Sequence, residues 1–259
     1  MFDFYHITVV FISFGAAFFS GLLGIGGGVV IFPAFLYLIP LLGFKTFSVN
    51  EITGIAATQS LAGMFFAFLN HKKHGNIDIN LVKKVLPIGL IGGLTGAVSA
   101  KFISEKSLLI IYLFLLMLAI VLILIPKAEC SYEGECKFKK PAFVNFLILL
   151  GTTISGSLGF AGAFTFIPIL NHFCNAPLKI AISSTTLIVF IITILVFAGK
   201  FAIGLVPFEL ILFIIIGSIF GANLGARLNK ILSSSALRAI LLFVIVFIGI
   251  RIFFTVMEY

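Results

Sequence analysis

Five stretches of this sequence contain no Asp, Glu, Lys or Arg over lengths suited to a lipid bilayer. Three of them, 52–71, 107–126 and 180–199, are each 20 residues long, the length of an α-helix that crosses a hydrocarbon core of about 30 Å. The other two, 4–44 and 141–178, span 41 and 38 residues, about twice the length that one crossing needs. We therefore expect three single crossings and two segments that cross, turn in or near the membrane, and return.

The low content of charged residues excludes an ordinary soluble domain. Only 10% of the 259 residues are charged, against about 25% in soluble proteins, so the sequence predicts an all-α polytopic membrane protein. The residues before the first apolar run lack the positive charge of a signal peptide, so we expect this helix to be retained. The net charge of +8 lies in short connections and forms no basic stripe, which favours membrane lipid, and not nucleic acid, as a partner.

The two halves of the chain repeat one another. The run SGLLGIGGG at 20–28 aligns with SGSLGFAGA at 155–163, and Pro33 then falls on Pro168. Two later blocks match in the same order, 57–59 with 184–186 and 92–108 with 221–237. Three collinear matches indicate a duplicated unit. We divide the chain into a first transmembrane repeat at 1–126, a charged linker at 127–140 and a second transmembrane repeat at 141–259.

Each half contains five hydrophobic segments. They cover 6–23, 29–42, 51–70, 81–102 and 107–126 in the first half, and 142–158, 164–174, 177–199, 205–229 and 234–256 in the second. The second segment of each half is short, so whether it crosses fully stays open. Ser48 and Glu51 have the spacing of a capping box, and we expect Asn175 to cap a helix with Pro177 in its first turn.

The distribution of Lys and Arg predicts how these segments are oriented. If all ten segments cross, twelve basic residues lie on one side and five on the other, namely Lys45, Lys101, Lys106, Lys200 and Arg251. If the short segments do not cross, the division is ten against seven. Basic loops stay in the cytoplasm, and the first division is the better sorted. We therefore expect inverted five-plus-five repeats, with both termini outside and with broken or re-entrant helices at the glycine motifs.

Two glycine-rich breaks are the candidate binding site. Gly24, Gly26, Gly27 and Gly28 interrupt the first half, and Gly159 and Gly162 interrupt the second. Irregular backbone at membrane depth is tolerated only where it is buried in protein or lines a cavity. The helix that follows each break presents unpaired N–H groups and the positive end of its dipole, which favours an anion. Two such sites could face each other near the midplane, as in transporters with discontinuous helices. Close packing through small residues is the alternative.

Polar clusters inside apolar helices extend this candidate site. The first half contributes Thr58, Gln59 and Ser60, and the second contributes Ser184, Thr185 and Thr186. Hydroxyl and amide groups can donate to an oxyanion without a buried positive charge. The alternative is hydrogen bonding between helices or to the preceding helical turn. We interpret the other spaced glycines as helix-packing faces: Gly89, Gly93, Gly217, Gly221 and Gly225.

The sequence contains no recognisable catalytic, metal or cofactor motif. Every Asp and Glu lies at or near the end of a segment, so we find no carboxylate relay of the kind that proton pumps use. The histidines also lie near segment ends, and we interpret them as interfacial. The three cysteines fit no zinc spacing, and we interpret them as inert thiols. The SGSLG run fails the G-x-S-x-G pattern of hydrolases, so a membrane-embedded enzyme acting on a lipid or peptide is only the alternative to a transporter.

The duplicated SGxxGxGGG motif followed by Pro, a Gly-Thr-Ser-like motif and a GxxxGA segment resemble the sulfite exporter TauE/SafE family. The resemblance covers nearly the whole chain. It implies a carrier in a bacterial or archaeal inner membrane that moves a small sulfur-containing or organic anion, such as sulfite, thiosulfate or a sulfonate, often outward. The family's glycine motif falls on Gly24, Gly26, Gly27 and Gly28, and more loosely on Gly159 and Gly162. Its Gly-Thr-Ser motif falls on 57–59 and 184–186.

The chain departs from the family pattern at three positions. Ala161 and Ala163 stand where the first half has glycines, and Gln59 replaces a small hydroxyl residue. The two half-sites are therefore not expected to be equivalent. The identity of the anion, the coupling ion and a homo-oligomeric state stay open.

Overall fold

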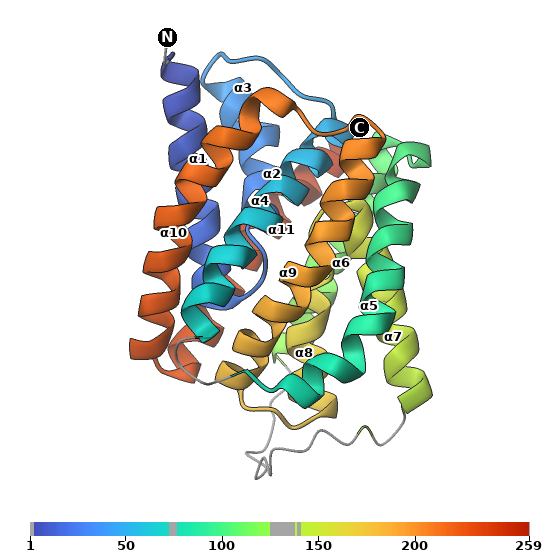
Figure 1. The fold of residues 1–259 in the computed structure, drawn as a ribbon. Coiled ribbons are helices and arrows are strands. Elements are labelled where there is room, and N and C mark those ends of the chain that lie inside the picture. The colour runs from blue at the N-terminus through green and yellow to red at the C-terminus, as the bar shows by residue number, and fades with distance from the viewer. Residues whose placement is uncertain (1–2, 73–76, 125–137, 139–140, 259) are drawn as a thin grey trace.

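A computed structural model describes residues 3–72, 77–124, 138 and 141–258, and this part of the chain is helical throughout, with no strand (Figure 1). The first half contains α1 (Phe4–Leu23), α2 (Gly28–Pro33), the π-helical turn η1 (Ala34–Leu38), α3 (Ile39–Leu41), α4 (Val49–Lys72), α5 (Ile79–Ser99), the 3-10 turn η2 (Ala100–Phe102) and α6 (Glu105–Leu124). The second half contains α7 (Pro141–Ser157), α8 (Ala163–Phe173), α9 (Leu178–Ala202), the 3-10 turn η3 (Phe208–Leu210), α10 (Ile211–Ile231) and α11 (Ser234–Glu258). All ten predicted segments are present, with ends within three residues of the prediction.

The lengths and surfaces of the helices are those of a multi-pass membrane protein. Among the described residues, six helices are long and apolar enough to span a membrane: Phe4–Leu23, Val49–Lys72, Ile79–Phe102, Leu178–Ala202, Phe208–Ile231 and Ser234–Met257. Gly28–Leu41 and Pro141–Ser157 are shorter apolar helices. Large apolar side chains such as Phe11 and Phe243 are 70% and 74% exposed, and contiguous apolar surface of this kind suits contact with lipid. The prediction of an all-α polytopic membrane protein is confirmed.

Local sequence signals explain one helix start and fail at another. The predicted capping box forms at α4, where the Ser48 N–H donates to Glu51 Oε2 (2.8 Å) and the Glu51 N–H donates to Ser48 Oγ (3.2 Å). The predicted cap of α9 is wrong, because Pro177 itself is the N-cap residue. Asn175 instead takes a left-handed conformation with φ of 56°, in the turn between α8 and α9.

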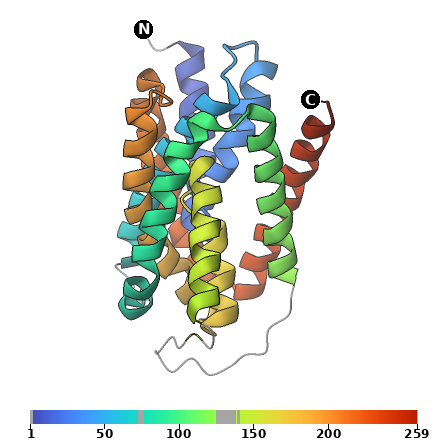
Figure 2. The ribbon, with the colours of Figure 1, turned by 90° about the vertical axis from the view of Figure 1, so that its right-hand side faces the viewer.

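The helices pack in pairs that correspond when the two halves are exchanged. The α1 helix packs on α10, and its counterpart α7 packs on α5. The most buried spans, α4 and α9, pack on each other, and each also packs on the fourth helix of the other half. Figures 1 and 2 place the start of α1 and the end of α11 at one end of the bundle, and the end of α6 and the start of α7 at the opposite end. This arrangement supports an inverted repeat.

Spaced glycines allow the paired helices to come into backbone contact. A Cβ at Gly221 of α10 would lie 2.1 Å from the Phe14 carbonyl oxygen of α1, and one at Gly96 of α5 would lie 2.0 Å from the Thr153 carbonyl oxygen of α7. Gly217 and Gly225 also meet the α1 backbone, whereas Gly89 and Gly93 meet the Ile192 side chain of α9. The interpretation of the spaced glycines as packing faces is confirmed.

One interpretation from the sequence is wrong for a cysteine. Cys174, which follows the end of α8, is disulfide-bonded and is therefore not an inert thiol. Cys130 and Cys136 lie outside the described residues, as does almost all of the predicted linker at 127–140.

We propose that the two halves are inverted repeats with both termini outside, and reporter fusions test this topology. A reporter fused after Tyr259 should show the activity of an extracytoplasmic location, and one inserted at Glu133 should show that of the cytoplasm. The physical reason is the unequal division of Lys and Arg between the two sides. Alkaline phosphatase and a fluorescent protein, each placed at both positions, make the measurement. Two reporters on the same side of the membrane would rule the topology out.

Candidate functional site

The first glycine break is a buried turn between α1 and α2. The α1 helix ends where the Gly24 N–H donates to the Ser20 carbonyl oxygen at 2.9 Å. Gly24 and Gly26 take φ of 67° and 77°, a left-handed conformation that L side chains resist. Gly24 to Gly28 are all buried. The predicted interruption of the helix is therefore present, and its backbone is enclosed by protein.

The second break repeats this turn between α7 and α8. Gly159 and Gly162 take φ of 88° and 83°, and Ala161 takes φ of 51°. Ala161 occupies the position of Gly26 in the repeat alignment, so the left-handed conformation is kept even where the glycine is replaced. A side chain in this conformation costs about 1–2 kcal/mol. The surrounding packing must therefore hold the second break in the same form as the first.

Each break carries backbone N–H groups that have no acceptor among the described residues. They include those of Gly26 and Gly27 in the first break, where the Ile25 N–H is also unpaired, and those of Ala161 and Gly162 in the second. The two pairs are matched by the repeat alignment. Because an unpaired buried N–H group is rare and unfavourable in native proteins, this duplicated pair is the strongest structural indication of a ligand site.

An aromatic side chain of the second break joins it to the first. A Cβ at Gly28 would lie 2.8 Å from Cδ1 of Phe160. The Phe160 ring also packs edge-on against Phe32 and against Tyr112, with centroids 6.0 and 5.3 Å apart. The Tyr112 hydroxyl donates to the Val29 carbonyl oxygen at 2.7 Å. The fold thus brings the two breaks together in one buried aromatic core.

Each break also packs on the central helix of the opposite half. A Cβ at Gly24 would lie 3.1 Å from the Ile182 carbonyl oxygen of α9, and one at Gly159 would lie 2.3 Å from the Thr53 carbonyl oxygen of α4. Close backbone approach therefore requires glycine at both positions. The breaks lie at the interface between the two halves, where relative movement of the halves would reach them.

Two of the predicted polar residues line the first break directly. Ser60 Oγ accepts a hydrogen bond from the Gly28 N–H at 3.2 Å. A Cβ at Gly27 would lie 2.9 Å from Nε2 of Gln59, which donates to the Ser13 carbonyl oxygen at 3.1 Å. Oε1 of Gln59 is buried without a partner. The structure therefore brings Gln59 and Ser60 together with the predicted glycines of the first half.

The other predicted hydroxyl groups differ in whether they already have hydrogen-bond partners. Thr58 and Thr186 donate to the preceding helical turn, at Gly54 O (3.0 Å) and Ser183 O (2.7 Å) respectively. Ser184 Oγ accepts from the Asp78 N–H at 3.0 Å, at the connection before α5. Thr185 Oγ1 is buried and has no partner. Within this group, Thr185 has no partner at all, and Ser184, which only accepts, also keeps an unused O–H donor.

Two pairs of buried polar residues were not predicted as site residues. Ser20 and Ser155 are matched in the repeat alignment, and both hydroxyls are buried without a partner. The alignment that located the glycines contained this signal. Lys200 is fully buried, and His71 is 5% exposed, so the predictions of a loop lysine and an interfacial histidine are wrong for these residues.

His71 links the end of α1, just before the first break, to α9 of the opposite half. Its Nε2 lies 3.1 Å from the Gly21 carbonyl oxygen of α1, and its Nδ1 lies 3.1 Å from Ser183 Oγ of α9. This contact could not be predicted from the sequence, because a histidine near a helix end is equally suited to the membrane interface.

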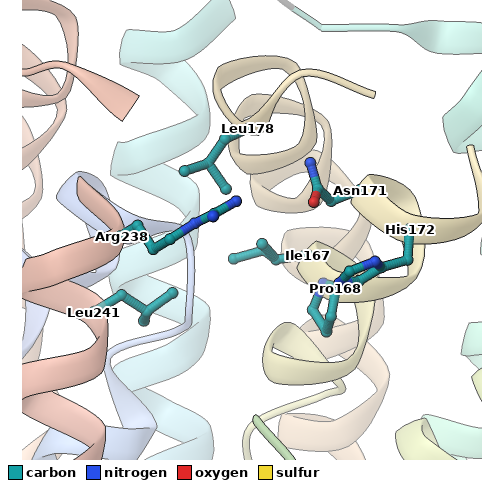
Figure 3. A pocket seen from close by; sticks show the side chains of 7 residues that line it. All are labelled: Ile167, Pro168, Asn171, His172, Leu178, Arg238 and Leu241. Carbon is teal, nitrogen blue, oxygen red and sulfur yellow. The ribbon is translucent and has the colours of Figure 1, made fainter. Parts of the chain in front are cut away.

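Two cavities of the structure lie away from the breaks. One of about 30 Å³ lies between α8, the start of α9 and α11, with the Arg238 side chain pointing into it towards Ile167 and Asn171 (Figure 3). It has room for only one or two water molecules. A groove of about 920 Å³ between α2–α3 and α11 has mostly apolar walls, which do not suit a small anion. Neither cavity contains a predicted site residue.

The described residues offer no metal-binding constellation, and Ser155 of the SGSLG run has no base beside it. They contain no group of three His, Cys, Asp or Glu side chains that could hold a metal ion. Ser155 Oγ has no hydrogen-bond partner, so the SGSLG serine lacks the adjacent base that a nucleophile needs. The described acids lie at helix starts or ends, for example Glu51 and Glu105 in first turns and Asp78 at the N-cap of α5.

Comparison with known proteins agrees with this geometry. The family model described as sulfite exporter TauE/SafE matches residues 9–252. The chain is 23% identical over 239 residues to the probable membrane transporter protein YdhB of Bacillus subtilis, covering 90% of this chain and 94% of that protein. It is 22% identical to the probable membrane transporter protein YunE of the same organism, covering 91% and 92%. No solved structure matches the chain. From the family match over almost its whole length and from its membrane-spanning helices, the chain belongs to the sulfite exporter TauE/SafE family and is a multi-pass membrane transporter.

Proposed function

We propose that this transporter carries a small sulfur-containing oxyanion, such as sulfite, thiosulfate or a sulfonate, outward across the inner membrane of the cell. The observation that supports this proposal is the duplicated pair of buried N–H groups at Gly26 and Gly27 and at Ala161 and Gly162. The description of the family as sulfite exporters supports the choice of substrate.

The donors around the breaks are suited to an oxyanion. An oxyanion accepts several hydrogen bonds, and a bond that involves a charged group contributes about 1.5–3 kcal/mol, roughly twice the value for neutral groups. Besides the N–H groups, the Thr185 hydroxyl and the repeat-matched Ser20 and Ser155 hydroxyls are buried without a partner. All of these groups are able to donate hydrogen bonds to an anion.

The position of the breaks suits alternating access. They lie between the two halves, and a relative rocking of inverted halves would expose the same site to either side in turn. The proposal therefore requires no channel through the resting protein.

Transport in liposomes distinguishes this proposal from the enzyme alternative. Purified protein should move radiolabelled sulfite or thiosulfate across the bilayer without changing it chemically, whereas protein-free liposomes should not. The expected result follows from the buried anion donors. Conversion of the anion, or of a lipid or peptide, by the protein in detergent would contradict the proposal and favour an enzyme.

A further inference from the structure

Lys200 is a fully buried basic residue near the end of α9. Its side chain is 0% exposed, although it lies only two residues before the last residue of the helix, Ala202. A lysine in this position would ordinarily extend its ammonium group to the membrane surface. Here it points inward, and the reason must lie in its contacts.

The ammonium group is held by two neutral oxygens. Lys200 Nζ donates to Thr53 Oγ1 of α4 and to the Ser157 carbonyl oxygen of α7, both at 2.8 Å. The Thr53 hydroxyl itself donates to the Asn50 carbonyl oxygen at 2.7 Å, so a lone pair of its oxygen faces the ammonium. The contact is therefore an ordered one, in which Lys200 bridges the two halves of the protein.

Neither of these oxygens balances the positive charge. Among the described residues no carboxylate lies within ion-pair distance of Lys200, and its ammonium group makes no hydrogen bond beyond the two above. An ammonium group has three N–H donors, so one is unused. Because a buried charge is strongly unfavourable unless it is paired, we expect this ammonium group to have an anionic partner.

The connection after α9 covers this group from the end of the bundle. The Leu205 N–H donates to the Lys200 carbonyl oxygen at 3.0 Å. The Leu205 carbonyl oxygen would lie 2.0 Å from a Cβ at Gly54, one residue after Thr53. This turn therefore packs directly on the start of α4, one residue from Thr53, whose hydroxyl oxygen accepts from the ammonium.

The ammonium lies beside the second glycine break. Ser157, which it contacts, is two residues before Gly159, and the Thr53 carbonyl oxygen would lie 2.3 Å from a Cβ at Gly159. The same short segment continues to the unpaired N–H groups of Ala161 and Gly162. The unused N–H of Lys200 and the free backbone donors thus belong to one buried region.

We propose that the Lys200 ammonium is the charged group that binds the transported anion at the second break. The inference rests on the proposed function and deepens it, because it makes the two half-sites chemically different. The first break is lined by the neutral Gln59 and Ser60, whereas the second contributes a full positive charge. The anion is therefore held more strongly at the second break, and it supplies the counter-charge that the protein does not.

The test compares the binding of a doubly and a singly charged anion, thiosulfate and methanesulfonate, to purified protein. Lys200→Gln keeps a side chain that donates hydrogen bonds but removes the charge, and Lys200→Arg keeps the charge. Lys200→Gln should weaken thiosulfate binding by about tenfold to a hundredfold. It should weaken methanesulfonate binding less, because Coulomb attraction scales with the charge of the ligand. Lys200→Arg should retain most of the affinity for thiosulfate.

Lys106→Met is the matched control, because it removes a lysine that is exposed at the start of α6; its affinities should equal those of the parent. Should Lys200→Gln not fold, Lys200→Met gives the same comparison. An unchanged ratio of the two affinities in a folded, charge-free variant would overturn the role of Lys200 while leaving anion transport intact. Failure of the parent protein to bind any anion of the sulfur series would instead overturn the proposed function and this inference with it.

Discussion

Gly221→Ala is expected to lower the free energy of unfolding by about 1–3 kcal/mol and to reduce the yield of folded protein sharply. The added Cβ would lie 2.1 Å from the Phe14 carbonyl oxygen and 3.0 Å from the Phe18 N atom. Neither backbone atom can rotate away as a side chain can, so α1 and α10 must separate along their whole contact. Thermal unfolding in detergent, together with the monodisperse fraction by size exclusion, measures the effect.

Two other glycines provide graded controls for this substitution. A Cβ at Gly93 would meet Cγ2 of the Ile192 side chain at 2.4 Å, which can shift, so Gly93→Ala should destabilise less. Gly249 has nothing within 4 Å of its added Cβ, and in a helix alanine is favoured over glycine by up to about 1 kcal/mol. Gly249→Ala should therefore be neutral or mildly stabilising. Equal stability of all three variants would show that backbone contact between α1 and α10 is not as close as described.

Gly162→Val should reduce anion affinity by about a hundredfold or more. Gly162 has φ of 83°, which a β-branched residue strongly resists, and a Cβ there would meet Thr152 Cγ2 at 2.6 Å. The turn must distort, and the N–H groups of Ala161 and Gly162 then lose their alignment. Two charge-assisted hydrogen bonds of about 1.5–3 kcal/mol each set the scale of the loss. Equilibrium binding of sulfite or thiosulfate to the purified, folded variant is the measurement.

Valine in place of Gly27, in the first break, is expected to act by crowding neighbouring atoms and not by straining the backbone. Gly27 has φ of −61°, which any residue adopts, but its Cβ would lie 2.9 Å from Gln59 and 3.0 Å from the Ala16 carbonyl oxygen. Gly27→Ala would already force Gln59 to move, and Gly27→Val more so. The Gly27 variants measure crowding alone, whereas Gly162→Ala adds backbone strain to its contact with Thr152, since only position 162 needs a positive φ.

A gentler substitution checks where the site lies. Thr185→Val removes one unpaired hydroxyl and should weaken anion binding by about twofold to a hundredfold. Thr193→Val is the matched control on the same helix, because the Thr193 hydroxyl is engaged with the Phe190 carbonyl oxygen at 2.8 Å. Parental affinity in both Gly162→Val and Thr185→Val, with binding lost in a normally folded variant of Gly93 or Gly221, would place the site on other helices.

Local patterns determined the architecture of this protein. Uncharged runs predict the helices because the bilayer core excludes charge along a whole span, and the ends of all ten segments agree with the structure. The glycine breaks were equally predictable, because the backbone takes a positive φ at Gly24 and Gly159, and a positive φ favours glycine at each position independently of the tertiary structure. The repeat then related one half to the other without any knowledge of how the halves pack.

The state of each polar side chain was decided only by tertiary structure. Thr58 and Thr185 are equivalent in the repeat, yet one hydroxyl is engaged with its own helix and the other is unpaired. A serine or threonine hydroxyl in a helix can bond to the preceding turn or to another partner, and the packing of neighbouring helices determines which of the two occurs.

Lys200 is the clearest example of a residue whose environment could not be predicted from the sequence. By sequence it is a basic residue at the end of a span, where an ammonium group ordinarily reaches water. In the fold, the turn at Leu205 closes over it, and Thr53 and Ser157 from two other helices hold its ammonium group. The sequence determines which residues lie in the membrane and where the helices break. Which charge is buried beside a break depends on three helices that are distant in the chain, and only their packing decides it.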